Sequence, residues 1–194
     1  MKVLGLTGGI GMGKSACADL LRQRGIRVID TDDLAHEAVL PGKPALRAIE
    51  QAFGPEYILE GGLNRQLMAQ RIFSDPQARQ RLEAILHPEI REAWQAQVRQ
   101  WRQEGAALAV VVIPLLFETH AERELDAVIC VACTEKTQAQ RVRGRGWSEQ
   151  QLQQRVASQW PVVKKIEAAN FLIWSEGGLD LHAAQLERIL ARFQ

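Results

Sequence analysis

Uninterrupted hydrophobic stretches along the chain predict strands that are buried on both faces. Five short stretches have this character: Val3–Thr7, Ile26–Asp30, Leu108–Ile113, Ala127–Val131 and Phe171–Trp174. They show no regular polar alternation, as expected of strands that helices cover on both sides. Because helical stretches separate them, the pattern predicts an α/β fold with a parallel sheet and right-handed crossovers.

The chain between the second and third predicted strands is longer than one crossover helix requires. Roughly 75 residues in this interval show no strand pattern, so we expect an inserted helical subdomain over residues 41–105. Residues 1–40 and 106–194 then form the core. Within the insert, Ser74-Asp75-Pro76 predicts a helix start, and His87-Pro88 predicts a break before a long polar helix that ends at Gly105.

Composition and charge are those of an ordinary globular protein. The 194 residues, 46% of them hydrophobic, fit one domain or one domain with an insertion. With 24 basic and 23 acidic residues the formal net charge is +1, so no general polycationic attraction would hold the protein on nucleic acid or an anionic membrane. We therefore expect neither as a partner, and we expect a monomer or a weak homo-oligomer.

The N-terminal segment and the cysteines indicate a cytoplasmic protein. The first apolar run breaks at Gly8 and Gly9, which makes it too short for a signal sequence or a membrane span. The three cysteines, an odd number, lie in apolar stretches at Cys17, Cys130 and Cys133, as is typical of reduced buried thiols. Although Cys130 and Cys133 have CxxC spacing, no second metal-binding pair accompanies them, and we assign both to the core.

A glycine-rich segment after the first predicted strand gives the strongest functional signal. Gly8–Ser15 matches GxxxxGK[ST] between a strand and a helix, the context in which such a loop binds phosphate. Its backbone N–H groups and the helix start would surround phosphate oxygens, with Lys14 reaching the β- and γ-phosphates and Ser15 ligating Mg²⁺. We predict that ATP binds Gly9, Ile10, Gly11, Met12, Gly13, Lys14, Ser15 and Ala16. A chance match in a glycine-rich turn is the alternative, and no GxGxxG motif of dinucleotide binding occurs.

Three carboxylates lie at the carboxyl end of the second predicted strand, in the run Asp30-Thr31-Asp32-Asp33. Ligands collect at the carboxyl ends of strands in open parallel sheets, which places this run near the phosphate loop. A carboxylate there can accept a proton from an attacking hydroxyl or hold hydrated Mg²⁺. Capping of the following helix by Asp32 or Asp33 is the alternative, but beside a phosphate loop we favour a role in phosphoryl transfer.

Five motifs, in this order, resemble the dephospho-coenzyme A kinase family. They are LTGGIGMGKS, DTDDLAH, LHPEIR, PLLFE and the arginine-rich segment before Gln159, and they span nearly the whole chain. The resemblance implies a P-loop NTPase-like three-layer α/β/α fold with a five-stranded parallel sheet, a helical coenzyme-A-binding insert and a lid over residues 140–160. It also implies ATP with Mg²⁺, and dephospho-coenzyme A as the acceptor, whose ribose 3′-hydroxyl is phosphorylated in the last step of coenzyme A biosynthesis.

The resemblance also assigns roles to individual side chains. Asp32 becomes the candidate general base beside the catalytic Lys14, and the lid arginines Arg141 and Arg145 would neutralise charge on the transferring phosphoryl group. The residues expected to hold the acceptor are Asp32, Arg65, His87, Arg91, Pro114, Leu115 and Leu116. Solvated helix faces for the arginines and strand-end packing for the two leucines are the alternatives.

The chain departs from the family pattern at three positions. Gly146 stands where the family usually has Asp, and Asn170 and Ser175 replace the Asp and the Asn of an ADxxIxN motif. These changes concern the adenine-side contacts and the polarity of the lid, and they leave the phosphate loop and Asp32 unchanged. Another P-loop kinase of a small metabolite or nucleotide, or an ATP-binding regulator, is the alternative function, while the lack of DxxG and [NT]KxD motifs argues against a GTPase.

Overall fold

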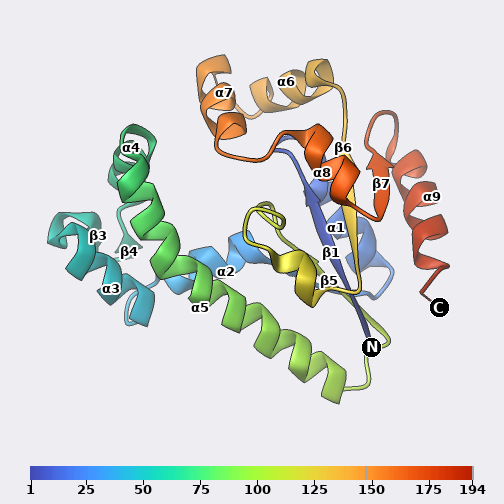
Figure 1. Ribbon diagram of the computed structural model, residues 1–194, viewed down its shortest axis with the longest axis horizontal. Coiled ribbons are helices and arrows are strands. Elements are labelled where there is room, and N and C mark those ends of the chain that lie inside the picture. Colours follow the sequence, from blue (N-terminus) through green and yellow to red (C-terminus); the bar gives the residue numbers. More distant parts are fainter. Residues whose placement is uncertain (147, 194) are drawn as a thin grey trace. The chain divides into compact units, whose positions relative to one another are not determined.

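The computed structural model describes residues 1–146 and 148–193 and divides into two compact units (Figure 1). The first unit combines residues 1–30 with the chain from Val98 onward, and the second consists of residues 31–97. Each has its own hydrophobic core. The phosphate-loop segment belongs to the first unit, whereas Asp32 and Asp33 belong to the second.

A parallel sheet forms the centre of the first unit. In the described residues its strands pair in the order β2-β5-β1-β6-β7, and every pairing is parallel. The strands are β1 (Lys2–Gly8), β2 (Arg27–Asp30), β5 (Leu108–Val112), β6 (Ala127–Ala132) and β7 (Phe171–Trp174). The prediction of five parallel strands is confirmed. Because β1 is the central strand, the loop after Gly8 leaves from the middle of the sheet.

Helices cover both faces of this sheet, as a three-layer fold requires. Leu4 and Leu6 of β1 point to one face and pack in the same cluster as residues of α1 and α9. Gly5 and Thr7 point to the opposite face because side chains alternate along a strand, and α8 packs against β1 and β6. The helices of this unit are α1 (Lys14–Gln23), η2 (Ala121–Glu124), α6 (Glu135–Arg143), α7 (Glu149–Ala157), α8 (Val162–Ala168) and α9 (Leu179–Leu190).

The second unit, residues 31–97, is mainly helical and also contains a small hairpin. Its elements are α2 (Thr31–Ala38), α3 (Pro44–Phe53), η1 (Pro55–Tyr57), β3 (Ile58–Leu59), β4 (Gly62–Leu63), α4 (Arg65–Ser74) and the first part of α5 (Pro76–Gln103). The buried centre of its core is formed by Val39, Leu46, Ile49, Met68 and Leu82. The expectation of no strand here is wrong, because strands of two residues leave no alternating pattern in the sequence.

The long helix α5 begins as predicted but does not break where predicted. Asp75 caps it, since its Oδ1 accepts from the N–H groups of Gln77 at 2.9 Å and Ala78 at 3.1 Å. The expected break at His87-Pro88 is wrong, because the helix continues through Pro88. An internal proline costs about 3 kcal/mol, and the buried Leu82 and Trp94 on either side supply packing that offsets this cost. No helix among the described residues is both long and apolar enough to span a membrane.

All three cysteines are buried free thiols within the described residues. Burial raises the pKa of Cys17 to about 11 and the pKa of Cys130 to about 11, and it also raises the pKa of Cys133. A thiol whose pKa is raised forms little of the reactive thiolate at neutral pH. The prediction that these residues belong to the core is therefore confirmed.

Candidate active site

The phosphate loop connects the end of the central strand β1 to the start of α1, and its shape depends on glycine. A Cβ atom on Gly8 would lie only 2.1 Å from the carbonyl oxygen of Val131 on the neighbouring strand β6. Gly13, which caps α1, has φ 97°, in the left-handed region that side chains disfavour. Other residues at these two positions would therefore displace the loop from β6 or from the helix start.

Two side chains from later in the sequence hold the loop from outside. Gln138 of α6 donates from Nε2 to the carbonyl oxygen of Ile10 at 2.8 Å, and the hydroxyl of Ser175 donates to the carbonyl oxygen of Met12 at 2.7 Å. In a trans peptide the N–H points opposite to the C=O. The N–H groups of Gly11 and Gly13 therefore point away from these outer contacts, toward the interior of the loop. Such inward amides form an anion-binding concavity.

The charged end of the loop is Lys14, the first residue of α1. Its ammonium donates to the carbonyl oxygens of Gly8 at 2.8 Å and Gly9 at 3.0 Å, so it lies across the loop. Ser15 is exposed and Ala16 is half-buried. The described first turn of α1 contains no acidic residue, so no carboxylate in that turn opposes the positive end of the helix dipole.

The structure brings one of the two predicted lid arginines to the phosphate loop. The guanidinium of Arg141 donates to the hydroxyl of Ser175 at 2.8 Å and to the Ser175 backbone carbonyl. Its Nη1 also lies 3.5 Å from the position that a Cβ on Gly13 would take. Arg145 is exposed beyond the end of α6, where its backbone N–H bonds to the carbonyl of Val142.

The second unit carries the remaining charged candidates. Asp32 lies exposed in the first turn of α2, directly after the helix start at Thr31, so it is also placed to complement the helix dipole. Arg65 is exposed at the first position of α4. His87 and Arg91 lie four residues apart on α5 and therefore share a helix face. The roles assigned to these four residues remain predictions.

Comparison with known proteins identifies the family. The family model of dephospho-CoA kinases matches residues 2–180. The chain belongs to the dephospho-CoA kinase family. It is 41% identical over 191 residues to the dephospho-CoA kinase of Bdellovibrio bacteriovorus, covering 98% of this chain and 95% of that protein. It is 44% identical over 194 residues to that of Syntrophotalea carbinolica, covering 99% and 92%.

A solved structure agrees with this assignment. The chain is similar to a dephospho-CoA kinase from Campylobacter jejuni with a TM-score of 0.72 and 25% sequence identity, covering 99% of this chain and 97% of that one. The resemblance that the five motifs predicted is therefore confirmed. The protein is a kinase with a P-loop-type α/β fold.

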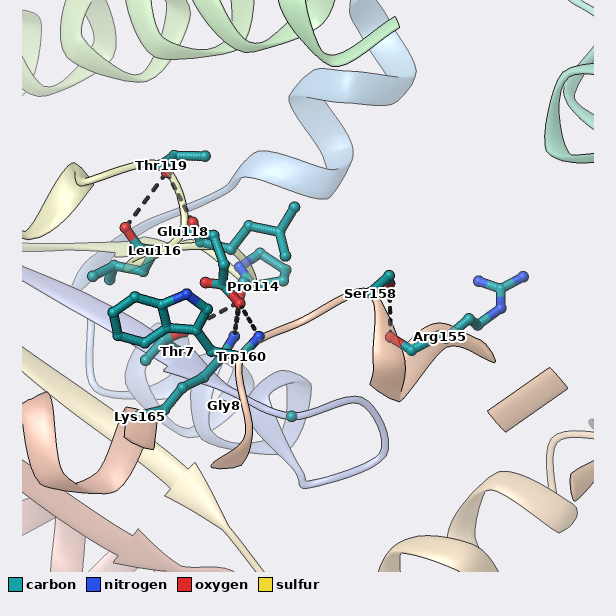
Figure 2. A network of polar contacts seen from close by, with 12 residues as sticks. Thr7, Gly8, Pro114, Leu116, Glu118, Thr119, Arg155, Ser158, Trp160 and Lys165 are labelled. Atoms are coloured by element: carbon teal, nitrogen blue, oxygen red, sulfur yellow. Dashed lines mark hydrogen bonds and ion pairs between the residues drawn. The ribbon is translucent and has the colours of Figure 1, made fainter. Parts of the chain in front are cut away.

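In this dephospho-CoA kinase family member, contacts around the Pro114 carbonyl hold the segment that follows β5 (Figure 2). The Pro114 carbonyl oxygen accepts from Thr7 Oγ1 at 3.3 Å and from Lys165 Nζ at 2.7 Å. Leu115 is half-buried, whereas Leu116 is fully buried and its Cδ1 lies 2.5 Å from where a Cβ on Gly5 would be. Leu116 thus packs on the sheet, which agrees with the alternative of strand-end packing. Binding of the acceptor by this segment stays a prediction.

The two departures near the last strand have clear structural roles. Asn170 accepts from the N–H of Val128 at 2.8 Å through Oδ1, and its own N–H donates to the Val128 carbonyl at 3.0 Å, which joins the start of β7 to β6. Ser175 joins the other end of β7 to β6, since its N–H donates to the Ala132 carbonyl at 2.7 Å. Sequence reasoning missed the contact of Ser175 with the phosphate loop, although it singled out the position as unusual for the family.

Hydrogen bonds stabilise the ionised form of the Glu176 carboxylate, next to Ser175. Glu176 accepts from the Thr134 hydroxyl, from the Thr137 hydroxyl at 2.8 Å and from the Thr134 N–H at 3.0 Å. These hydrogen bonds, first of all that from the Thr134 side chain, lower the pKa of Glu176 to about 2. They join the segment after β7 to the start of α6, which is the helix that carries Gln138 and Arg141.

The residues of the loop fit a magnesium ion that is carried by a nucleotide. Mg²⁺ prefers hard oxygen ligands and in nucleotide sites takes one or two from the protein, with phosphate and water supplying the others. Ser15 offers such an oxygen, exposed at the start of α1 next to the loop amides. No group of three or more His, Cys, Asp or Glu residues able to hold a metal was found in the described ranges.

Proposed function

We propose that this kinase transfers the γ-phosphoryl group of MgATP to the ribose 3′-hydroxyl of dephospho-CoA, giving CoA and ADP, the last step of coenzyme A biosynthesis. The observation that carries the proposal is the loop from Gly8 to Ser15. Its Ile10 and Met12 carbonyls are held from outside, which turns the N–H groups of Gly11 and Gly13 inward as an anion site. Membership of the dephospho-CoA kinase family supplies the acceptor.

The loop binds the triphosphate and prepares it for transfer. Inward N–H groups donate hydrogen bonds to the phosphate oxygens, and Lys14 exchanges its contacts with the Gly8 and Gly9 carbonyls for the β- and γ-phosphates. The Ser15 hydroxyl would hold the Mg²⁺ that enters with ATP, and this ion would supply positive charge to offset that of the phosphates. Because charge is spread over the oxygens in the transition state, these contacts act mainly by positioning and electrostatic stabilisation.

The transfer step assigns a separate role to Asp32. The 3′-hydroxyl oxygen forms a bond to the γ-phosphorus while the bond from that phosphorus to the oxygen of the ADP leaving group breaks. Asp32 accepts the hydroxyl proton. Arg141, and Arg145 when the lid closes, balance the charge on the phosphoryl group.

The acceptor is held by the charged side chains of the second unit. Dephospho-CoA carries phosphates, for which guanidinium groups provide two parallel N–H donors. Arg65 at the start of α4, with His87 and Arg91 on one face of α5, has the chemistry for this purpose. Pro114, Leu115 and Leu116 contribute the segment after β5.

A coupled ADP-release assay tests the proposal directly. Purified protein with MgATP should produce ADP with dephospho-CoA and much less with nucleosides or other small alcohols, and mass spectrometry should find CoA in equal amount. Lys14→Ala should abolish useful turnover because the main phosphate charge partner is lost. Efficient phosphorylation of a different acceptor would instead identify another metabolite kinase. ATP binding without any phosphorylated acceptor would identify a regulator and reject the enzyme assignment.

A further inference from the structure

A charged side chain is buried beside the phosphate loop without any assigned role in the reaction. Lys165 of α8 has 0% exposure and is the largest of the fully buried side chains among the described residues. A buried ammonium requires close partners because it has lost its water. Its partners are the Pro114 carbonyl at 2.7 Å and Glu118 Oε1 at 2.9 Å (Figure 2).

Glu118 connects this lysine to the end of the lid. Its Oε1 also accepts from the backbone N–H of Trp160 at 2.7 Å. The indole of Trp160 stacks on Phe117 with ring centroids 5.9 Å apart and planes at 14°. A charge-assisted hydrogen bond and a ring stack thus join Trp160, the last residue of the predicted lid (residues 140–160), to the segment after β5. The ion pair joins the same Glu118 carboxylate to Lys165 of α8.

These contacts continue to the phosphate loop. The Pro114 carbonyl that Lys165 holds also accepts from Thr7, which directly precedes Gly8 in β1. At the other end of the lid, Arg141 contacts Ser175, and Ser175 contacts the Met12 carbonyl of the loop. Both ends of the lid are therefore fixed close to the phosphate loop, one through Ser175 and the other through Glu118 and Lys165.

We propose that Glu118 and Lys165, called here the anchor pair, are positioning residues that hold the Trp160 end of the lid so that the phosphoryl group passes to the acceptor and not to water. This inference rests on the proposed kinase function. Neither residue touches the reacting atoms in the proposal. The pair acts through the Trp160 backbone and the Pro114 carbonyl, and its loss lets the lid move away from the phosphate loop and admit water.

A purely structural ion pair is the competing explanation, and the two make different predictions. If the pair only stabilises α8, its loss lowers the amount of folded enzyme, and ATP consumption and CoA formation fall together. If the pair positions the lid, ATP hydrolysis without transfer increases relative to CoA formation. The ratio of ADP to CoA separates these cases because it does not depend on the concentration of folded enzyme.

The experiment compares Glu118→Gln, Lys165→Met and the double variant with the wild type. Glu118→Gln keeps the side-chain shape but removes the negative charge, so it weakens the contacts with both Trp160 N–H and Lys165. Because it leaves no cavity, it should fold even if Lys165→Met does not. Glu167→Gln and Lys136→Met, which change exposed residues in the same chemical way, are the matched controls. Each protein is measured for ADP and CoA produced, for KM of both substrates, and for thermal unfolding.

For Glu118→Gln we expect CoA formation to fall on the order of 10- to 100-fold, the effect of a small misplacement of reacting groups. KM for ATP should change little, and the ratio of ADP to CoA should rise above the wild-type value. Lys165→Met leaves the Glu118 charge without its cation, whereas the double variant removes both charges. The double variant should therefore unfold at a higher temperature than Lys165→Met, while its ratio of ADP to CoA stays above the wild-type value. A ratio equal to the wild-type value in every folded variant would overturn the proposal. Failure of the kinase function itself would look different, because the wild type would then make no CoA.

Discussion

Arg141 of α6 and Ser175, which follows β7, form a bidentate contact in which the guanidinium donates to both the hydroxyl and the backbone carbonyl of the serine. The same hydroxyl donates to the Met12 carbonyl. One buried serine thus links a proposed catalytic arginine to the backbone of the phosphate loop. The predicted lid and the proposed nucleotide site share this connection, so a change at Ser175 should affect both.

We expect Ser175→Ala to weaken ATP binding more than it slows the chemical step. The Met12 carbonyl loses its outside partner, so the Gly13 N–H is no longer held toward the phosphates, and the loss of this buried network costs about 1 to 3 kcal/mol. KM for ATP should rise roughly tenfold, which corresponds to about 1.4 kcal/mol. Steady-state kinetics measure this change. Ser74→Ala, at the exposed end of α4, is the control, and an unchanged KM in Ser175→Ala would show that the loop keeps its shape without this contact.

The Glu176 carboxylate should make stability depend on acid pH in a defined direction. Its pKa is lowered in the folded state to about 2 from the ordinary 4.5 by hydrogen bonds from Thr134 and Thr137. A lowered pKa means that the stabilisation is complete above pH 4.5 and is lost as pH falls toward 2. The advantage of the wild type over Glu176→Gln in free energy of unfolding should therefore shrink across this window. Urea titrations at several pH values measure it, and an advantage that grows as pH falls would contradict the sign.

The three cysteines should be nearly inert in the folded protein. With a pKa of about 11 for Cys17 and Cys130, roughly 0.1% of either thiol is ionised at pH 8, and burial blocks access as well. Iodoacetamide should label all three only after denaturation. Lys136→Cys introduces an exposed thiol on α6 as the positive control. Rapid labelling of native Cys130 would mean that β6 opens readily, contrary to its position beside the central strand.

Sequence patterns predicted those features that depend on neighbouring residues. The apolar runs of β1 and β5 located the buried strands, and the phosphate loop was found because its glycines, Lys14 and Ser15 are consecutive in the chain. The helix start at Pro76 followed from Asp75 in the same way. These signals are local, so a single sequence contains them completely.

Features that depend on distant residues were not predicted. Lys165 looks like a solvated lysine beside Lys164, and only the fold shows that Glu118 and the Pro114 carbonyl bury it. The continuation of α5 through Pro88 was missed for a related reason, since packing by side chains such as Trp94 offsets a local penalty. Tertiary contacts therefore decide where local preference is overridden.

Asp32 and Asp33 at the start of α2 allow a test of whether Asp32 acts as a general base or only stabilises the N-terminus of the helix. Asp32 and Asp33 are both exposed in the first turn, so both favour the positive helix end, each by about 0.3 to 1 kcal/mol. If Asp32 accepts the substrate proton, Asp32→Asn should lower kcat on the order of 10²- to 10⁴-fold with ATP binding nearly intact, as the loss of a general base does. Asp33→Asn should cost similar stability but keep most of kcat. Single-turnover kinetics and thermal unfolding of both variants distinguish the two roles. If both variants slowed the chemical step equally and only slightly, Asp32 would act at the helix start and not as the general base.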